Sequence, residues 1–447
     1  MSKADTIPAS KALSDEYGNL HCLADELARG GQGVVFRTMD GDLAIKQPLD
    51  ASGQPDRDAN LRDRFQNIRL LPIPSRIPIS MPLAILRDEP GYVMRLLSGM
   101  QPFSHFDLDG KTKKQLQEKS SELPQWIAGI PDKEMALRLL YYAVTGSARR
   151  RLFALSKCAA ILARLHCAGL VYGDVSPNNS FIGTGSSRDV WLIDADNLRF
   201  EMRGGGSSVY TPGYGAPEVV RGINSIGPRT DCWAFAVMAF KMLALCHPFI
   251  GRKVLQPDDD GGWDAEPPAD GMPADLDEQA YAGYLPFVDD KDDDSNKGVG
   301  GLPRELVATP NLRLLFQETF GPGRTQPHLR PTMSFWALEL AKAFDRSLEC
   351  HQCKMSYFVE DSEKCPYCDA PLPAFIRART SRWEAIIPDN SKEFAIPHRM
   401  FHPFSFEHHD DAEYEAILDG KTKTVFPARG TKTFPDSLKF TFVEAAK

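Results

Sequence analysis

The chain has 447 residues, of which 42% are hydrophobic and 25% are charged, so at roughly one to two hundred residues per domain it holds two or three domains. Lys and Arg total 52 against 60 Asp and Glu, a net charge of −8 that argues against a general polyanion-binding surface and against nucleic acid as a partner. The acidity is local, because residues 257–301 carry 14 carboxylates and 2 lysines and the remainder of the chain is mildly basic.

The cellular compartment can be predicted from targeting signals and from the distribution of cysteines. No run approaches the roughly 18 to 20 apolar residues that cross a bilayer, and the first residues lack the basic-then-apolar pattern of a signal peptide. We therefore expect a cytoplasmic protein without membrane contact. Five of the nine cysteines are scattered through apolar stretches, where we expect reduced core thiols. These five are Cys22, Cys158, Cys167, Cys232 and Cys246.

The first hundred residues read as a short tail followed by strands. Residues 1–20 are polar and predict a flexible N-terminal tail. Residues 21–97 contain short β-type runs broken by Gly and Asp, which predict a strand-rich first lobe. Within it, Leu61, Phe65 and Ile68 have helical spacing and predict one helix in residues 56–70.

Residues 98–346 are mainly helical in pattern. The longest periodic segment is ARRRLFALSKCAAILARLHCAG, and its final Gly169 is a C-cap candidate. Residues 251–301 are rich in Asp, Gly and Pro without periodicity, which predicts an acidic surface insertion. Its segment DDKDDDSNKG alternates like a calcium loop, but Ser295 occupies the position of the required Gly, so we expect a solvated loop.

A Gly-rich turn and a downstream lysine lie in the first lobe. ELARGGQGVVFRT is followed by DLAIK, which places Lys46 13 residues after Gly33. Such a turn can bring backbone amides close to phosphates, with the lysine neutralising their charge. By itself the segment is equally compatible with an ordinary hairpin.

An ordered series of polar motifs follows in the second lobe. GLVYGDVSPNNSFI contains Asp174 and Asn179, VWLIDADN contains Asp194, and later segments contain Glu218, Asp231 and Arg330. With this series, residues 21–346 resemble the protein kinase superfamily, closest to bacterial Ser/Thr kinases of the eukaryotic-like type with divergent catalytic motifs. The resemblance implies an α+β, bilobal kinase-like fold with a β-rich first lobe and a helical second lobe.

The resemblance also implies roles for individual residues in phosphoryl transfer. Asp174 would accept the proton of the substrate hydroxyl, Lys46 would neutralise phosphate charge, and Asn179 and Asp194 would bind Mg²⁺, or Mn²⁺, on ATP. Thr211, before the substrate-docking loop, favours Ser/Thr over Tyr as acceptor. The residues implied around the nucleotide are Ala28, Gly30, Gly31, Gly33, Val35, Ala44, Lys46, Met94, Arg95, Leu97, Asn179 and Asp194.

Three other residues match structural positions of that family. Asp231 resembles the buried aspartate that binds the catalytic-loop backbone. Glu218 and Arg330 resemble the ion pair that anchors the end of the activation segment.

The chain departs from the family pattern at the partner of Lys46 and after the metal ligand. No Glu occurs between Lys46 and Glu89, so Asp63 or Gln66 is the candidate partner on the predicted helix. Asp194 is followed by Ala195 and Asp196 in place of Phe and Gly. We expect Asp196 either to bind a nearby backbone amide or to tune the metal preference.

Two cysteine pairs precede a small C-terminal module. Cys350-x2-Cys353 and Cys365-x2-Cys368 have the spacing of a zinc ribbon, predicted over residues 347–371 as a structural Zn²⁺ site. A disulfide pairing or an iron site is the alternative. Residues 372–447 contain short alternating runs that predict a small all-β module. The balanced charge of both segments favours protein contact over nucleic-acid contact.

These observations predict an ATP- and Mg²⁺-dependent kinase that phosphorylates Ser or Thr of protein substrates. The zinc ribbon or the β-rich tail is the expected docking site for a protein partner. A kinase followed by a zinc ribbon resembles kinases of bacterial stress-response or defence systems. Three alternatives remain. They are a pseudokinase scaffold that binds nucleotide without efficient transfer, a nucleic-acid-associated regulator acting through the zinc module, and a small-molecule kinase, which the segment TPGYGAPE disfavours.

Overall fold

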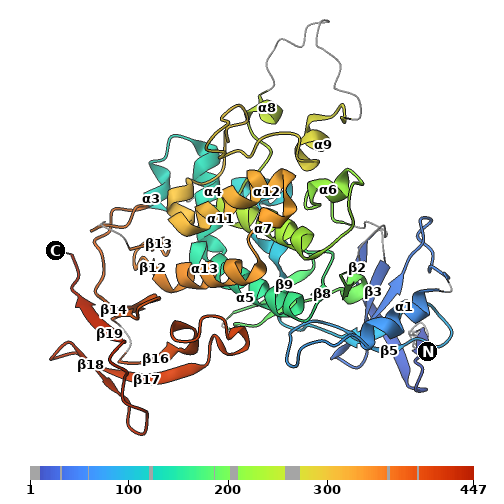
Figure 1. Cartoon of the computed structure of the whole chain (residues 1–447), viewed down its shortest axis with the longest axis horizontal. Coiled ribbons are helices and arrows are strands. Elements are labelled where there is room, and N and C mark those ends of the chain that lie inside the picture. The colour runs from blue at the N-terminus through green and yellow to red at the C-terminus, as the bar shows by residue number, and fades with distance from the viewer. Residues whose placement is uncertain are drawn as a thin grey trace, which may run out of the picture.

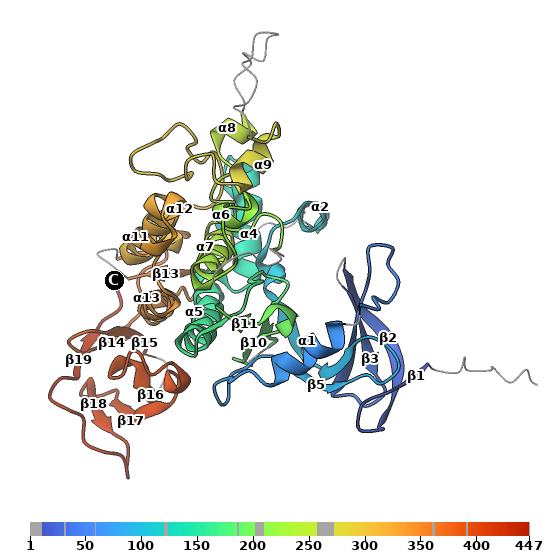
Figure 2. The same cartoon turned by 45° about the vertical axis from the view of Figure 1, so that its right-hand side comes forward.

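The computed structural model describes residues 11–30, 33–58, 60–119, 124–185, 187–201, 210–256, 272–359, 363–389 and 392–446. The chain forms an N-terminal sheet, a helical body beside it and a C-terminal module on another side of that body (Figures 1 and 2). None of the described helices combines the length and apolar character needed to cross a bilayer.

The N-terminal sheet has six strands in the order β1-β2-β3-β4-β6-β5, all antiparallel to their neighbours. Helix α1 (Asn60–Arg69) packs on it through Phe65 and Ile68, which confirms the predicted helix. The ring of Phe65 contacts Tyr92 edge-on at 4.8 Å. The strands are β1 (Ala12–Ser14), β2 (Leu20–Gly30), β3 (Gly33–Thr38), β4 (Leu43–Pro48), β5 (Pro82–Ile85) and β6 (Tyr92–Arg95).

The prediction of a flexible tail over residues 1–20 is wrong for residues 11–20. Leu13 in β1 is buried in the sheet, and β1 pairs with β2. Asp15 then accepts hydrogen bonds from the backbone of Tyr17 and Asn19, which closes the turn between the two strands. Residues 1–10 lie outside the described part of the chain.

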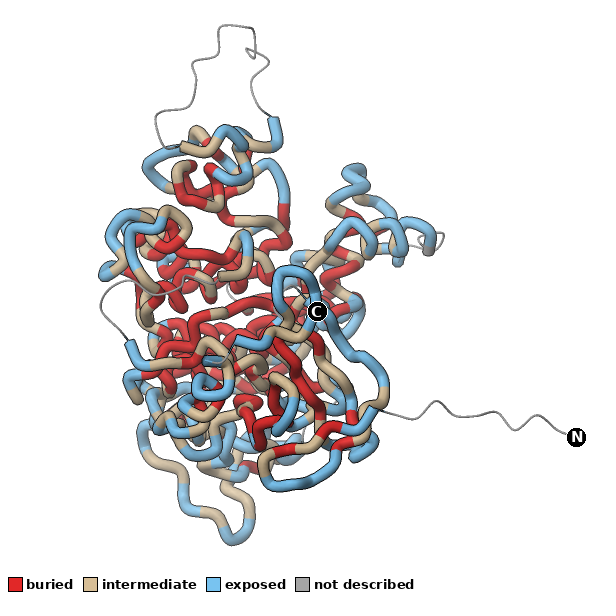
Figure 3. Tube along the Cα trace, turned by 90° about the vertical axis from the view of Figure 1, so that its right-hand side faces the viewer, coloured by how far each residue is buried: buried red, intermediate tan, exposed pale blue. Residues whose placement is uncertain are grey.

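Helix α5 (Ser147–Cys167) is the centre of the helical body and is buried along most of its length. Buried residues gather in the interior of the molecule (Figure 3). It matches the longest periodic segment of the sequence, and Gly169 follows its end with φ of 75°. Helices α7 (Pro228–Ala244) and α13 (Met333–Arg346) pack against it. The other helices are α2 (Gly110–Lys119), α3 (Gln125–Ala128), α4 (Lys133–Val144), α6 (Pro217–Val220), α8 (Arg252–Leu255), α9 (Leu276–Tyr281), α10 (Arg304–Val307), α11 (Pro310–Phe320) and α12 (Pro322–Thr325).

Short strands and 3-10 turns complete this body. Strands β7 (Met100–Pro102), β9 (Ser180–Gly183) and β10 (Val190–Leu192) form one small sheet, and β8 (Leu170–Val171) pairs with β11 (Arg199–Phe200). The 3-10 turns are η1 (Phe103–Phe106), η3 (Ala195–Asn197) and η4 (Pro327–Leu329).

The predicted acidic insertion is only partly a solvated loop. Phe287 is buried in an aromatic cluster, 5.3 Å from Phe240 and 5.0 Å from Phe320 by ring centroids. The side chain of Asn296 is buried and donates to the carbonyls of Phe249 and Pro286. The sequence did not predict these buried residues, because single apolar or polar residues without helical or strand periodicity give no signal of burial. Residues 257–271 lie outside the described residues, and Asp293 is exposed.

The scattered cysteines are not all core residues. Cys158 and Cys232 are buried, Cys22 and Cys246 are partly buried, and Cys167 is exposed. Cys167 is the last residue of α5, where the helix leaves the core, so the prediction was wrong for this thiol.

The segment between the two cysteine pairs caps the N-terminus of α5. Strands β12 (Ser347–Glu349) and β13 (Ser356–Phe358) pair beside the helix. The helix has no side-chain cap of its own at Gly146, but the hydroxyl of Ser356 accepts from the backbone N–H of Arg149 at 2.7 Å. A distant segment therefore satisfies one of the free N–H groups of the first helical turn.

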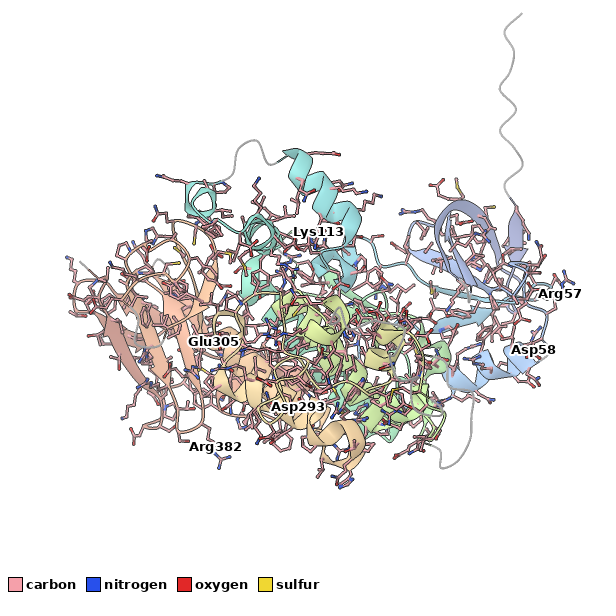
Figure 4. The ribbon with its side chains drawn as sticks, turned by 90° about the horizontal axis from the view of Figure 1, so that it is seen from above. Arg57, Asp58, Lys113, Asp293, Glu305 and Arg382 are labelled. Atoms are coloured by element: carbon pink, nitrogen blue, oxygen red, sulfur yellow. The ribbon has the colours of Figure 1, made fainter. Side chains whose placement is uncertain are left out.

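The C-terminal module consists of two three-stranded antiparallel sheets, with the orders β15-β14-β19 and β16-β17-β18. The predicted β character of this region is confirmed. Its strands are β14 (Phe375–Arg379), β15 (Glu384–Pro388), β16 (Glu393–Pro397), β17 (Ala412–Asp419), β18 (Thr424–Pro427) and β19 (Lys439–Val443), with 3-10 turns η5 (His398–Met400) and η6 (Phe406–His408). Charged side chains such as Arg382 project from its outer surface (Figure 4).

The module packs against α13 and α5 of the helical body. Leu338 and Ala341 of α13 belong to the same buried cluster as Trp383 and Ile396 of the module. The aromatic run around residues 400–406 is divided between the two parts, since Met400 lies in the module core and Phe406 packs against the helical body. The module is therefore attached to the body through an apolar contact.

Candidate functional site

A cleft of about 820 Å³ lies between the N-terminal sheet and the helical body. This volume suits a small-molecule ligand. The cleft brings together Lys46 from β4, Asp174 from the loop after β8, and Asp194 from the end of β10. It is also lined by Ala28, Gly30, Gly33, Val35, Ala44, Met94, Arg95, Leu97 and Asn179. Every residue predicted around the nucleotide therefore lines one cleft, apart from Gly31, which lies outside the described residues.

The carboxylate of Asp174 is fixed from two sides. Thr211 donates its hydroxyl to Oδ1 at 2.8 Å, and Asn179 donates its amide to Oδ2 at 2.9 Å. Burial raises the pKa of Asp174 above its usual value, against the lowering effect of these two hydrogen bonds. A carboxylate with a raised pKa accepts a proton more readily, which suits a group that receives the proton of a hydroxyl.

The loop that carries Asp174 is fixed by Asp231 of α7. Asp231 accepts from the backbone N–H groups of Tyr172 and Gly173, both at 2.9 Å, and from His166 at 3.0 Å. The structure thus places Asp231 in the supporting position that the sequence predicted. Gly173 has φ of 84° at this turn, a conformation that favours glycine.

A second support lies beyond the cleft. Arg330 is fully buried and binds Glu218 through two parallel hydrogen bonds of 2.7 and 2.8 Å. This pair is the predicted anchor of the segment that follows Thr211. Its arginine also lies over the ring of Trp233 at 4.8 Å.

The partner of Lys46 differs from the prediction. The lysine, 6% exposed, donates to Asp194 at 2.5 Å and to Asp196 at 2.7 Å, and the structure gives it no contact with Asp63 or Gln66. Burial alone would lower the pKa of Lys46, but the adjacent carboxylates of Asp196 and Asp194 outweigh it and raise that pKa. Asp196 therefore neither binds a backbone amide nor stands free beside the metal ligands.

The other contacts of Asp196 were also missed by sequence reasoning. The hydroxyl of Tyr92, a fully buried residue of β6, donates to Asp196 Oδ1 at 2.6 Å. Arg64 of α1 donates to the Asp196 carbonyl through two nitrogens at 2.7 and 3.0 Å. Two features of the sequence could have indicated that Asp196 binds Lys46. They are the extra carboxylate two residues after Asp194 and the absence of a Glu from α1.

The Gly-rich turn joins β2 and β3. A Cβ atom at Gly33 would lie 2.9 Å from the carbonyl oxygen of Gln47, so this glycine is required by the close approach of β4. A Cβ at Gly30 would meet nothing within 4 Å. Gly30 therefore leaves space at the mouth of the cleft, as expected for a turn that approaches a ligand.

The cleft fits a nucleotide with a divalent cation. Asn179 and Asp194 offer hard oxygen ligands of the type that Mg²⁺ and Mn²⁺ prefer, and Lys46 supplies a cation beside them. Val35, Ala44 and Met94 supply apolar walls for a planar base. Asp194 has a left-handed backbone, with φ of 59°, a strained state of the kind found at functional sites.

The four cysteines of the two pairs form a separate cluster. Their sulfur atoms all lie within 4.8 Å of one another, with Cys350 to Cys368 and Cys353 to Cys365 both at 3.6 Å. A disulfide needs about 2.05 Å, whereas a tetrahedral shell with bonds of about 2.3 Å separates sulfur atoms by about 3.8 Å. The geometry is compatible with zinc and excludes disulfides among these four residues.

The two cysteine loops have the same backbone pattern. The backbone N–H of Cys350 donates to the carbonyl of Met355, and the backbone N–H of Cys365 donates to the carbonyl of Ala370 in the equivalent position. Lys354 and Asp369, each next to the second cysteine of its pair, share a positive φ of 61° and 56°. Two equivalent loops therefore present two sulfur atoms each.

Comparison with known families bears on the helical body. The family model for the protein kinase domain matches residues 133–260. This stretch resembles a protein kinase. The match includes Asp174, Asn179, Asp194, Glu218 and Asp231, whereas Lys46 and the Gly-rich turn lie before it. It supports a kinase-type phosphotransfer function, which implies ATP, a divalent metal and a protein substrate. No curated protein matches the chain at a significant level.

Proposed function

We propose that the chain is a protein kinase that transfers the γ-phosphate of ATP to Ser or Thr hydroxyls, in a bacterial signalling, stress-response or defence system. The observation that carries this proposal is the convergence of Lys46, Asp174, Asn179 and Asp194 on one cleft. The hydrogen bond between Thr211 and Asp174 supports Ser/Thr specificity, because it joins the start of the substrate-docking loop to the proton acceptor.

Each residue has a defined task in this reaction. When bound, ATP supplies the phosphoryl group, and Mg²⁺ or Mn²⁺ neutralises the charge of its phosphates. Asp174 accepts the proton of the substrate hydroxyl as the oxygen–phosphorus bond forms, and ADP leaves. Lys46 neutralises phosphate charge, and Asn179 and Asp194 bind the metal. The protein thus acts by positioning groups and stabilising charge.

The proposal extends to the domain organisation. Residues 21–97 and 98–346 form the two lobes of the kinase, residues 347–371 the zinc ribbon, and residues 372–447 a β module. We assign a structural Zn²⁺ to Cys350, Cys353, Cys365 and Cys368, because two equivalent loops present their sulfur atoms at nearly tetrahedral spacing. The outer surface of the ribbon or the module takes a protein partner, and the protein acts in the cytoplasm.

The experiment is a transfer assay with radiolabelled ATP and Mg²⁺, with and without a generic basic protein substrate. Wild-type protein is compared with Asp174→Ala and Asp194→Ala, and exposed Asp293→Asn is the matched control (Figure 4). We expect transfer by the wild type and the control, and loss of at least about a hundredfold in both site variants. Acid hydrolysis of the product then identifies the labelled amino acid.

Three results would contradict the proposal or a part of it. Nucleotide binding by the wild type, shown by thermal shift, without any transfer would favour the scaffold function. Salt-sensitive binding of DNA or RNA that depends on the zinc module would favour the nucleic-acid function. Label on tyrosine alone would retain the kinase and reject the Ser/Thr specificity.

A further inference from the structure

We infer that Asp196 is the positioning residue for Lys46, in the role that a helix glutamate has in the kinases this chain resembles. The inference rests on the proposed function. Its basis is the pair of contacts made by the Asp196 carboxylate, Oδ2 to Lys46 at 2.7 Å and Oδ1 to Tyr92 at 2.6 Å.

Asp194 cannot serve alone as the partner of Lys46. Its carboxylate is the proposed metal ligand, and a metal competes for the same oxygen atoms. Lys46 is buried, and a buried cation without a partner is strongly destabilising. Asp196 supplies a second carboxylate that stays with the lysine when Asp194 turns to the metal.

The carboxylate of Asp196 is itself held in place. Tyr92 has no exposed surface, and its ring packs edge-on against Phe65 of α1. The ring of Tyr92 is therefore held in place, and its hydroxyl is positioned to donate to Oδ1. Oδ2 is left to accept from Lys46.

Helix α1 takes part through a cation instead of a carboxylate. Arg64 donates to the carbonyl of Asp196 through two nitrogens, and to Asn197 Oδ1 at 3.0 Å. The helix thus binds the backbone of the η3 turn, and the turn binds the lysine. In the kinases that this chain resembles, a helix glutamate binds the lysine directly. Here a helix arginine binds the backbone of the turn that carries Asp196, so α1 is linked to Lys46 through Asp196.

The first test measures steady-state transfer by Asp196→Asn, with exposed Asp293→Asn as the control. We expect kcat to fall by at least about tenfold, with a change of less than about threefold in KM for ATP, because a displaced Lys46 weakens stabilisation of the transition state more than nucleotide binding. Tyr92→Phe, which removes only the orienting hydroxyl, is expected between the wild type and Asp196→Asn.

The second test avoids the buried carboxylate. Arg64 is exposed, so Arg64→Ala folds, and Arg62→Ala on the same helix is its matched control because Arg62 is also exposed and its hydrogen bond goes to the carbonyl of Arg87. We expect kcat to fall several-fold in Arg64→Ala and to stay unchanged in Arg62→Ala. Wild-type rates in both Asp196→Asn and Arg64→Ala would overturn the inference and leave the proposed function intact. Absence of transfer by the wild type would remove the proposed function itself.

A different observation carries a second inference, located in the C-terminal module. We propose that His398, His402 and Glu413 form a binding site for a divalent transition metal such as Zn²⁺ or Ni²⁺. One donor atom from each of the three residues lies within 4.8 Å of the others. Two imidazoles and a carboxylate are a donor set that these metals bind.

The backbone holds this site in place. The amides of Phe401 and His402 both donate to the carbonyl of His398 at 3.0 Å, so the two histidines are separated by one helical turn. Their rings stack with centroids 4.3 Å apart. The amide of His398 donates to the carbonyl of Asp411 at 2.8 Å, which fixes the turn beside β17 and Glu413.

The side chains face each other in a partly exposed position. His398 Nδ1 lies 2.6 Å from Glu413 Oε2, and these two side chains are 22% and 19% exposed. The pair is shielded enough to limit competition from water and open enough for a metal to enter. Histidines one helical turn apart present their nitrogens on one side, which is the spacing of known zinc-binding helices.

The test compares metal content and Co²⁺ binding in protein loaded with zinc. We expect wild-type protein to bind one more metal per chain than His402→Ala or Glu413→Gln, whereas exposed His328→Ala matches the wild type. The additional Co²⁺ should show visible d–d bands without thiolate charge transfer, which separates this site from the four cysteines. Equal stoichiometry in all four proteins would overturn the proposal. Because His402 is exposed, its replacement leaves the fold intact.

Discussion

Two buried arginine–carboxylate pairs hold different parts of this molecule, and they differ in what remains when one partner is lost. Arg330 binds Glu218 inside the helical body, and Arg399 of the module binds Asp345 of α13 through two hydrogen bonds of 2.6 and 2.7 Å. Arg330 has Glu218 as its only anionic partner among the described residues, since its other acceptors are carbonyls. Arg399 also binds Asp410 at 2.8 Å.

The two pairs therefore differ in the effect that replacing the carboxylate has on stability. Loss of Glu218 leaves a fully buried charge without a counter-charge, which is costly. Loss of Asp345 leaves Arg399 with Asp410 and with the carbonyl of His409. The first pair is therefore essential to the body, and the second is one of several contacts that attach the module.

The largest effect is expected for Glu218→Gln. The variant should lose about 3–5 kcal/mol in free energy of unfolding, because the guanidinium of Arg330 stays buried without a negative partner. Urea denaturation followed by circular dichroism measures this loss. Exposed Glu305→Gln is the control and should change stability by less than about 0.5 kcal/mol (Figure 4).

The next effect is expected for Asp345→Asn. It should cost about 2–3 kcal/mol, since Arg399 keeps Asp410 while the indole N–H of Trp383, which donates to Asp345 at 2.8 Å, keeps an amide oxygen. Hydrogen exchange over residues 375–443 should increase, while residues 147–167 stay protected. If Asp345→Asn lowers the free energy of unfolding as much as Glu218→Gln does, and hydrogen exchange increases in both residues 375–443 and 147–167, the two ion pairs are equivalent.

Acidification is expected to act on the module through His409. Burial lowers the pKa of His409 to about 4, and the nearby cations Lys157 and Arg399 lower it further. The hydrogen bond to the carbonyl of Pro403 acts in the opposite direction and is too weak to restore the usual value. Between the unfolded pKa of about 6.5 and pH 4 the unfolded chain binds more protons, so stability is complete above pH 6.5 and falls as the pH drops.

At pH 5 this linkage amounts to about 2 kcal/mol. His409→Gln, which retains a donor for Pro403, should flatten the pH dependence of hydrogen exchange in the module between pH 7 and 5. The helical body has a comparable histidine, His247, whose pKa is also lowered to about 4 by burial. An unchanged pH dependence of the module in the variant would assign its acid sensitivity to other groups.

The smallest effect is expected at the surface of the junction. Glu407 binds Arg164 of α5 at 3.2 Å, and the same arginine donates to the carbonyl of Ser75 at 2.6 Å. Because Glu407 is half exposed, Glu407→Gln should cost less than about 1 kcal/mol, and the loss should disappear at high salt. A loss that persists at 1 M salt would indicate that this pair is shielded and contributes to the attachment of the module.

The sequence predicted the elements whose signals are local. Helix α5 has clear periodicity, the strands around Lys46 are short β-type runs bounded by Gly and Asp, and the cysteine spacing identified the four-cysteine cluster. Strand β14 was predicted only as part of the β-rich region 372–447, because Phe375 and Ile376 are both buried and the alternation typical of a half-exposed strand is absent. Helix α9 has a local N-cap in Asp275, but it was missed because it has only six residues and lies in the acidic stretch that was predicted as a loop.

The candidate site was predicted as a set of residues and only partly as a set of contacts. Asp174, Asn179 and Asp194 could be identified because their order along the chain matches a known pattern. The partner of Lys46 could not, because it depends on how α1 and the η3 turn meet, and that contact joins residues 132 positions apart. The supporting role of Tyr92 is hidden for the same reason.

The cap that Ser356 provides for α5 also sets an order of events during synthesis. The helix leaves the ribosome 207 residues before its cap, so the nascent helical body waits for the cysteine loops with an incomplete first turn on its central helix. Domains that are contiguous in sequence fold as they emerge, from the N-terminus onward. In this chain the last step of folding the body belongs to a later segment, so a ribosome that stalls before residue 356 releases a body that lacks this contact.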